Sequence, residues 1–458
     1  MSTADFISSS SEPIVELPIE FTAPPRRIDA KAPGVIRQFP ADVIQTLHSE
    51  LIARINPSRL ERPQLEDRGE LRSAILEIIT RQRLPYSGVE RDQLAEIVLQ
   101  EIYGYGPLQS LIDDDTVGDI LVNTHQTVYV ERKGVLEETN VRFQDREHLM
   151  AIIERIVSAV GRHVDESSPM VDARLRDGSR VNVIVPPLAI DGPLVSIRKF
   201  GKHPLGPQNL LNFKSLTPEM LEFIMAAVKA KLSIIISGGT GAGKTTLLNV
   251  LSTALGDKER IVTIEDSAEL QLQQRHVARL ETRPPNVEGK GEIRQRELVI
   301  NALRMRPDRI ILGEVRGAEA MDLLQAMNTG HDGSLATIHA NSPREAITRL
   351  ESMVLMGSTN LPEKAIRQQI ASAVQLFIQA TRLSDGTRRI TNITEVCGMQ
   401  GDVLTTQEVF TFRKTGVDSQ GKVHGVFKGS GVPPQCAHII ETAGIRLTPG
   451  IFDSYMEV

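Results

Sequence analysis

The period of the hydrophobic positions changes along the chain, and each change predicts a different kind of structure. From about residue 41 to 105, apolar residues recur at helical spacing, which predicts a small helical bundle. In the segment DQLAEIVLQEI, one helical face carries Leu94, Ile97, Val98 and Ile102. Before it, residues 1–40 hold polar and proline-rich runs such as SSSSEP and TAPPRR, so we expect a disordered tail there.

Two regions of mixed strands and helices follow the bundle. Residues 106–205 contain the strand patterns GDILVN, VYVERKG, SRVNVIVPP and PLVSIRKF and the amphipathic stretch HLMAIIERIVSAV, which predict a mixed α/β domain. Prolines and glycines in GKHPLGPQNLLNFKS predict a linker at 206–215. From 216 to 458 the segments LSIIIS, KTTLLNVLSTAL and RIVTIED alternate as in a parallel, doubly wound sheet. After residue 385 the pattern weakens and predicts short strands with turns such as SDGTRR.

Composition narrows the class of protein. The chain has 458 residues and carries 52 basic against 58 acidic residues, a net charge of −6, so we expect no stable nucleic-acid binding. Cys397 and Cys436 form no CxxC pair, which argues against a disulfide scaffold and for a reducing compartment. No apolar run is long enough to cross a bilayer, and the N-terminus lacks the pattern of a secretory signal. We therefore expect a cytoplasmic protein that reaches a membrane only through a partner.

The segment GGTGAGKT, from Gly238 to Thr245, matches the phosphate-binding pattern GxxxxGK[ST]. An apolar strand precedes it and a helical stretch follows, as this loop requires. Backbone N–H groups of such a loop surround phosphate oxygens, and the helix N-terminus adds its positive end. We expect Lys244 to reach the terminal phosphates of ATP and the Thr245 hydroxyl to ligate Mg²⁺. The predicted nucleotide-binding residues are Gly238, Gly239, Thr240, Gly241, Ala242, Gly243, Lys244, Thr245 and Thr246.

Acidic residues at two later strand ends are candidates for hydrolysis. The strand in RIILGEVRG ends in Glu314, followed by Val315, whereas many phosphate-hydrolysing folds place an aspartate for magnesium and then a glutamate for water. Either the base is elsewhere, or this strand is not part of a nucleotide site; for the first case, the acidic segment TIEDSAEL offers Glu269. We hypothesise that Glu269 orients and deprotonates the attacking water and that Glu314 acts on Mg²⁺ through a water. The alternative for TIEDSAEL is a solvated acidic loop.

Histidine ends another predicted strand, SLATIH. His339 at this position could sense a γ-phosphate by hydrogen bonding, although the residues alone favour a packed or capping histidine. His331, in TGHDG, is a weaker candidate.

Four segments in this order, GGTGAGKTT, IEDSAEL, RPDRIILGEVRG and GSLATIHANSP, resemble the type II and type IV secretion ATPase superfamily. The longer stretches VDARLRDGSRVN, RLETRPPNVEGKGE and ALRMRPDRIILGEVRGAEAMDLLQAMNTGHDGS resemble its Tad (Flp) pilus assembly branch, the CpaF type. The resemblance covers about residues 90–455. Type II secretion relatives usually carry a four-cysteine zinc insertion that this chain lacks, so the Tad or the conjugation-type branch fits better.

The resemblance implies a RecA-like P-loop ATPase domain at 216–458, preceded by the α/β domain and the helical bundle. It further implies a homohexamer at the cytoplasmic face of the inner membrane. There, ATP hydrolysis would move the N-terminal domain, turn a membrane platform protein and push pilin subunits into or out of a filament. It also favours a catalytic role for His339.

Arginines of the N-terminal domain are implied to complete the active site. Phosphoryl transfer usually needs more positive charge than one lysine supplies, and arginine suits bidentate contact with phosphate. The resemblance carries this role onto Arg180 and Arg198. Reserve candidates are Arg174, Arg279 and Arg283. The alternative is that Arg180 and Arg198 are solvated or pair with acids such as Asp172.

Three other functions stay open at this point. A conjugation-type type IV secretion ATPase would share the chemistry and differ in its membrane partner. A nucleotide-binding scaffold of low turnover is a different class, and the joint presence of Lys244, Thr245, Glu269 and Glu314 argues against it. A small-molecule kinase is less expected, because such enzymes are usually shorter.

Overall fold

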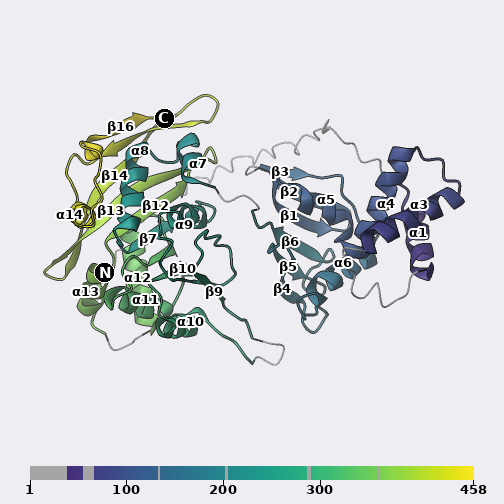
Figure 1. The fold of residues 1–458 in the computed structure, drawn as a ribbon, viewed down its shortest axis with the longest axis horizontal. Coiled ribbons are helices and arrows are strands. Elements are labelled where there is room, and N and C mark those ends of the chain that lie inside the picture. Colours follow the sequence, from purple (N-terminus) through teal and green to yellow (C-terminus); the bar gives the residue numbers. More distant parts are fainter. Residues whose placement is uncertain (1–38, 55–66, 133–134, 202–204, 286–289, 358–360) are drawn as a thin grey trace, which may run out of the picture. The chain divides into compact units, whose positions relative to one another are not determined.

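The structure is a computed structural model that describes residues 39–54, 67–132, 135–201, 205–285, 290–357 and 361–458 (Figure 1). The predicted disordered tail lies outside these residues, except for its last two positions. Contacts divide the chain into two units. The first holds the chain up to Ala173 together with Asn182–Ile197, and the second holds Arg174–Val181 together with Arg198–Val458.

Three helices of the first unit pack around one apolar cluster. They are α1 (Ala41–Arg54), α3 (Asp67–Arg81) and α4 (Gly88–Tyr103). The helix α4 begins at a capping box, because the Ser87 hydroxyl accepts from the Glu90 N–H and the Glu90 carboxylate accepts from the Ser87 N–H. Fully buried residues of the cluster include Leu47, Leu51, Ile75, Ile78, Ile79, Leu94 and Val98. The helices predicted between residues 41 and 105 are therefore present.

A six-stranded sheet in the order β3-β2-β1-β6-β5-β4 follows these helices in the same unit. Its strands are β1 (Val117–Thr124), β2 (Thr127–Arg132), β3 (Val135–Glu138), β4 (Met170–Arg174), β5 (Arg180–Ile184) and β6 (Leu194–Arg198). The short elements η1 (Gly106–Leu108) and α5 (Gln109–Asp113) precede it, and α6 (Arg146–Ser158) buries its apolar stripe. The tip of the β4–β5 hairpin, Arg174–Val181, groups by its contacts with the second unit.

The second unit is built on a ten-stranded sheet in the order β16-β15-β14-β13-β12-β7-β11-β10-β8-β9. The parallel strands are β7 (Ile234–Gly238), β8 (Ile261–Glu265), β9 (Val277–Glu281), β10 (Arg309–Val315), β11 (Leu335–His339) and β12 (Leu376–Arg382). Antiparallel strands extend the sheet from β12 onwards: β13 (Arg388–Gln400), β14 (Val403–Val417), β15 (Val423–Gly429) and β16 (Tyr455–Glu457). The prediction of a parallel sheet is thus correct for one half and wrong for the other.

Long strands at the C-terminal side replace the short strands predicted after residue 385. The pairing of β13 with β14 shifts register between Val396 and Gly398, and that of β14 with β15 shifts between Lys414 and Gly416. A bulge inserts one extra residue, so the residues after it alternate between the two faces in the opposite phase. In the sequence, one long strand then has the apolar–polar pattern of two short strands.

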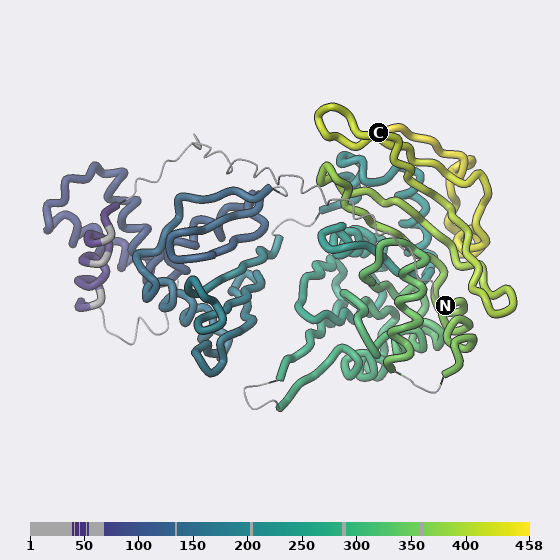
Figure 2. The backbone as a smooth tube through the Cα atoms, turned by 180° about the vertical axis from the view of Figure 1, so that it is seen from behind, coloured from purple at the N-terminus to yellow at the C-terminus, as the bar shows by residue number. Residues whose placement is uncertain are grey.

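Helices cover both faces of this sheet (Figure 2). Ile234 and Ile236 of β7 point into one apolar cluster and Ile235 into the other, as alternation along a strand requires. One face is covered by α8 (Pro218–Lys229), α9 (Lys244–Ser252) and α14 (Cys436–Thr442), the other by α10 (Gln295–Ala302), α11 (Glu319–Asn328), α12 (Pro343–Gly357) and α13 (Glu363–Ala373). The short elements η2 (Leu303–Met305) and η3 (Ile451–Asp453) complete the unit.

The segment predicted as a linker, residues 206–215, holds the short helix α7 (Pro207–Asn212). Its glycine and proline mark a helix start: Pro207 occupies the first turn, and the Asn209 side chain accepts from the Gly206 N–H at 2.8 Å. Proline and glycine are common in linkers and also at the first residues of helices. Here they mark the start of α7.

A fully buried arginine closes the amino end of the parallel strands. Arg309, the first residue of β10, donates to the carbonyls of Val228 at 2.8 Å and Gly333 at 3.2 Å. Its guanidinium also pairs with Glu259, at 3.1 Å for one of the two bonds. A Cβ on Gly333, whose φ is +75°, would lie 2.5 Å from this guanidinium. Arg309 thus fills the space that a side chain at 333 would need.

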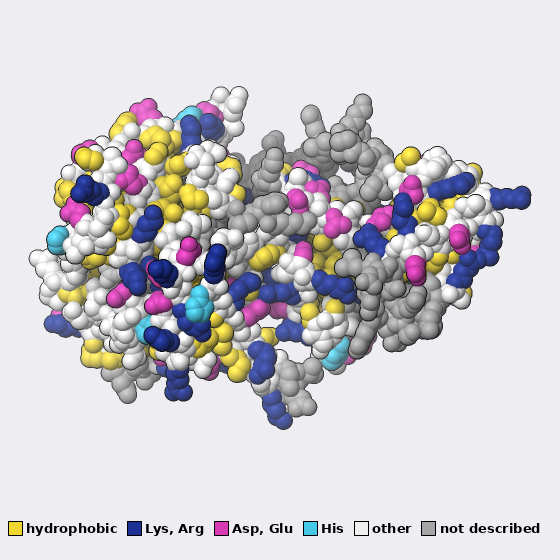
Figure 3. Space-filling view, viewed as in Figure 1, with side chains coloured by type: hydrophobic (Ala, Val, Ile, Leu, Met, Phe, Trp, Pro, Cys, Tyr) yellow, Lys and Arg dark blue, Asp and Glu magenta, His cyan; other side chains and the backbone are white. Residues whose placement is uncertain are grey.

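On the face of the second unit seen in Figure 3, basic and acidic side chains are interspersed. No helix among the described ranges is long and apolar enough to cross a membrane.

Candidate active site

The predicted phosphate-binding loop joins the carboxyl end of β7 to the start of α9. Gly241 and Gly243 have φ of +68° and +93°, conformations that residues with a Cβ rarely adopt. Because β11 and β12 flank β7, the loop emerges inside the sheet at the carboxyl ends of parallel strands, where such sheets usually bind ligands. The residues from Gly238 to Thr246 therefore have the strand–loop–helix context that a P-loop requires.

Lys244, the first residue of α9, folds back over this loop. Its ammonium group donates to the carbonyls of Gly238 at 3.0 Å and Gly239 at 3.1 Å. Partial burial lowers its pKa, the Glu314 carboxylate raises it, and the Arg316 guanidinium lowers it again. The lysine and Glu314, far apart in sequence, are thus electrostatic neighbours at the loop.

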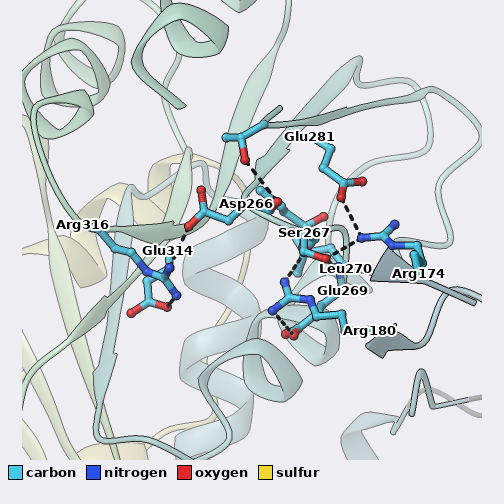
Figure 4. Close-up of polar contacts among 11 residues, drawn as sticks. Arg174, Arg180, Asp266, Ser267, Glu269, Leu270, Glu281, Glu314 and Arg316 are labelled. Carbon is cyan, nitrogen blue, oxygen red and sulfur yellow. Dashed lines mark hydrogen bonds and ion pairs between the residues drawn. The ribbon is translucent and has the colours of Figure 1, made fainter. Parts of the chain in front are cut away.

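Glu314 and Asp266 are joined by one arginine that the sequence analysis did not single out. Arg316 donates to Glu314 at 2.9 Å and to Asp266 at 2.8 Å (Figure 4). The bond to Glu314 raises the pKa of Arg316, although the side chain is largely exposed. The carboxyl ends of β8 and β10 therefore present two carboxylates that share one arginine.

Glu269 lies in the loop after β8, and 31% of its side-chain surface is exposed. Its carboxylate pairs with Arg180 at 3.1 Å, and Arg180 also donates to the Ser267 carbonyl at 2.7 Å (Figure 4). Asp172, the partner considered from the sequence, instead accepts from Asn182 at 3.0 Å. The structure therefore brings together the predicted base and one predicted arginine.

Another acid of this segment, Glu265, was expected near the phosphates from the sequence but was given no role. Its side chain is only 3% exposed, and one oxygen accepts from the N–H groups of Glu269 at 2.8 Å and Leu270 at 2.9 Å. The other oxygen has no partner among the described residues. Burial raises the pKa of Glu265. The signal was available, since Glu265 ends a strand whose five residues are all buried.

The remaining predicted arginines have different surroundings. Arg198 lines the same cavity as Arg180. Arg174 donates to the Ser267 hydroxyl at 2.5 Å and pairs with Glu281 at 2.8 Å. The positive charge of Arg279 lowers the pKa of Glu265, and Arg283 donates to the Gly291 carbonyl at 2.7 Å.

A cavity of about 310 Å³ opens beside the start of α9, within the second unit. Its lining includes Arg180, Arg198, Thr245, Thr246 and Glu269. With Lys199, which also lines it, three cationic residues, two hydroxyls and one carboxylate thus border a single space next to the loop. This combination suits a polyanion that carries a metal ion.

His339 ends β11 directly beside the loop, because its register partner on β7 is Gly238. It is half-buried. His331 precedes β11 at the other end of the strand, with its Nδ1 3.2 Å from the Ala326 carbonyl. The structure thus favours His339 over His331 as a phosphate neighbour.

The donors present fit a magnesium ion that arrives with a nucleotide. Among the described residues, no group of three or more His, Cys, Asp or Glu side chains could hold a metal alone. Mg²⁺ usually takes one or two protein oxygens and completes its shell with phosphates and water. The Thr245 hydroxyl and the Glu314 carboxylate are oxygen donors of this kind.

Comparison with known proteins identifies the family. The profile of the type II/IV secretion system protein family matches residues 101–426. The chain belongs to this family.

Relatives within the family carry conjugation and secretion names. This member is 38% identical over 313 residues to a putative conjugal transfer protein of Mycobacterium tuberculosis, which covers 67% of this chain and 88% of that protein. It is 31% identical over 318 residues to the type IV secretion system protein VirB11 of Brucella suis, covering 63% and 88%. The crystal structure of VirB11 from Brucella suis aligns at 28% identity and a TM-score of 0.35, covering 63% of this chain and 94% of that one.

Proposed function

We propose that this secretion-family protein is a motor ATPase that hydrolyses ATP to drive a secretion or pilus machine. The observation that carries the proposal is that Lys244 folds over the P-loop while Glu314, near the carboxyl end of β10, is close enough for its charge to act on the lysine. A glycine loop and a lysine are sufficient to bind phosphate. Hydrolysis also needs groups that position water and Mg²⁺, and carboxylates at the neighbouring strand ends can do this.

Binding is assigned to the loop and the start of α9. The N–H groups from Gly238 to Thr246 would surround the phosphates, and Lys244 would leave the loop carbonyls for the terminal phosphates. Mg²⁺, when bound, would be held by Thr245 and, through a water, by Glu314, and would neutralise phosphate charge. His339 would read the presence of the γ-phosphate from the end of β11.

We assign activation of the attacking water to Glu269, and we assign control of its carboxylate to the nearby arginines. The ion pair with Arg180 occupies the carboxylate that a base must present to water. We propose that Arg180, with Arg198, moves to the phosphate when ATP is bound and so releases Glu269. An arginine at this place typically contributes about 10³–10⁵ to the rate. Arg180→Ala and Arg198→Ala should then keep ATP binding and lose most turnover.

The machine served by the motor is also a proposal. The longer segments that resemble the Tad branch favour assembly of a Tad-like pilus by a homohexamer bound to an inner-membrane platform. The conjugal transfer and VirB11 relatives favour the conjugation-type alternative. Affinity purification of the full chain from its host membrane separates the two: recovery of a pilus platform protein supports the first, and recovery of conjugation-channel components supports the second.

Steady-state ATP hydrolysis by the full-length oligomer tests the enzyme itself. We expect turnover that depends on Mg²⁺ and is lost in Lys244→Ala with the fold intact. Equal phosphate release from the wild type and Lys244→Ala would remove the ATPase proposal. Tight ATP binding without turnover would favour the scaffold.

A further inference from the structure

The hairpin between β12 and β13 rises directly beside the P-loop. Its first strand runs parallel to β7, with Ala380 opposite Gly238 in the register (Figure 1). The two backbones are so close that a Cβ on Gly238 would lie 2.5 Å from the Ala380 carbonyl oxygen. The turn that follows β12 is therefore a fixed neighbour of the loop.

One side chain of this hairpin forms a hydrogen bond with the P-loop. Arg388, the first residue of β13, donates from its Nε to the Gly241 carbonyl at 2.9 Å. Its Cδ lies 3.4 Å from the position of a Cβ on Gly243. Gly241 and Gly243 are the two left-handed positions of the loop. Arg388 thus holds the carbonyl of one of these glycines and lies beside the other.

The hairpin that carries Arg388 is itself anchored. Its turn is closed by a bond from the Leu383 N–H to the Thr387 carbonyl at 2.8 Å. Asp385 accepts from the Thr387 hydroxyl at 2.6 Å and from the Val423 N–H of β15 at 2.9 Å. The neighbouring Arg389 is buried and donates to the Phe213 carbonyl at 2.9 Å. Arg388 therefore reaches the loop from a base that is tied to the antiparallel half of the sheet.

We propose that Arg388 is a positioning residue that holds the P-loop in its phosphate-binding shape; the inference rests on the proposed function. The Gly241 carbonyl belongs to the same peptide group as the Ala242 N–H, so a bond to the oxygen fixes the direction of that N–H. A loop held in its binding shape loses less conformational freedom when the phosphates arrive. The remaining guanidinium nitrogens add positive charge beside the loop.

Arg382 on the opposite strand of the hairpin offers a matched control. It is exposed, and its terminal nitrogen lies 3.6 Å from the position of a Cβ on Gly241. Within the described ranges it makes no ion pair and no hydrogen bond to the loop. Arg382→Met removes one positive charge next to the same glycine and leaves the bond from Arg388 in place.

The experiment compares Arg388→Met, Arg388→Lys and Arg382→Met in the full-length protein. Calorimetric titration with ATP and with ADP should show both binding roughly tenfold more weakly to Arg388→Met, the loss expected for one hydrogen bond from a charged donor. In turnover assays, KM should rise by a similar factor while kcat changes less than about twofold, because the loop binds ground state and transition state alike. Arg388→Lys, which keeps a donor, should recover part of the affinity. The unfolding temperature without nucleotide should stay within about 2 °C of wild type.

Three results decide the outcome. Unchanged ATP and ADP affinity in Arg388→Met, with a wild type that binds both, overturns the positioning role and leaves the ATPase proposal standing. An equal loss in Arg382→Met overturns it as well, because charge alone would then explain the effect. A wild type that binds neither nucleotide refutes the proposed function and this inference together.

Discussion

Gly313→Ala tests whether Glu265 positions the loop that carries Glu269, by adding a single methyl group. Gly313 lies in β10, one residue before Glu314, and its φ is not in the left-handed region, so alanine brings no backbone strain there. The added Cβ would lie 2.8 Å from the Cγ of Glu265 and 3.4 Å from its Cβ. The substitution therefore pushes on one buried side chain.

The size of the push can be worked out from these distances. Ordinary contact begins at 3.4 Å, so the Glu265 side chain must withdraw by at least 0.6 Å, the difference between 3.4 and 2.8 Å. Its bonds to the N–H groups of Glu269 and Leu270 are 2.8 and 2.9 Å long. A withdrawal of this size takes them past the usual limit of about 3.2 Å. The loop that carries Glu269 then loses its buried anchor.

Two measurements follow from this displacement. Overpacking of a tight interior costs about 1–3 kcal/mol, and at about 2–4 °C per kcal/mol the unfolding temperature should fall by several degrees. ATP turnover should fall roughly 10- to 100-fold, because a displaced catalytic group loses its alignment. ATP binding should stay near wild type, since Gly313 lies outside the P-loop.

Gly416→Ala is the control, because Gly416 also lies in a strand, has an ordinary φ and has no atom within 4 Å of an added Cβ. It should behave as wild type in both assays. If Gly313→Ala hydrolyses ATP at the rate of Gly416→Ala, Glu265 does not position Glu269 and the reasoning is refuted.

The other predictions concern the charged groups directly. Lys244→Ala should abolish turnover with an unchanged circular dichroism spectrum; near-normal turnover would remove the nucleotide site. Glu269→Gln and Glu314→Gln should both lose turnover, and a Mg²⁺ titration should show a shifted requirement only for Glu314→Gln; the reverse pattern would exchange their roles. Arg180→Ala should retain fluorescent-ATP binding and lose about 10³-fold or more in rate, and a milder loss would make Arg180 a structural partner of Glu269. Burial raises the folded-state pKa of Glu265 above its ordinary 4.5, so the folded state binds the proton more tightly and stability should fall as pH rises from there through the raised pKa. Urea denaturation across pH should show that Glu265→Gln removes this slope, and an unchanged slope would mean that Glu265 does not cause it.

The parallel half of the second unit was readable from the sequence because its signals are local. The strand patterns LSIIIS, RIVTIED and SLATIH became β7, β8 and β11, and Gly238–Thr245 follows a strand as predicted. Each signal needs only a run of apolar residues and a neighbouring loop. The candidates Glu269, Glu314 and His339 came from signals of the same local kind, since each lies near the end of a strand, and their roles stay predictions.

Pairings across long sequence distances could not be predicted in this way. Nothing near Arg316 in the sequence indicates that it bridges to Asp266, and nothing near Arg388 indicates the Gly241 carbonyl, 147 positions away. Strand order decides both contacts, and strand order is a property of the assembled sheet. The antiparallel half could not be predicted for a local reason. Bulges interrupt the alternation of apolar and polar residues along its long strands.

Arg309 and Gly333 have a consequence for how the sequence can change over generations. The guanidinium occupies the space of a side chain at 333, and the Lys231 Cα lies 2.8 Å from the same Cβ position, so position 333 requires glycine even after the arginine has been lost. Loss of the arginine first would leave Glu259 without its partner and two carbonyls without their donor. Each change is therefore costly by itself, and neither makes the other easier. Among descendants of one ancestral chain, loss of Arg309 should not be followed by a larger residue at 333.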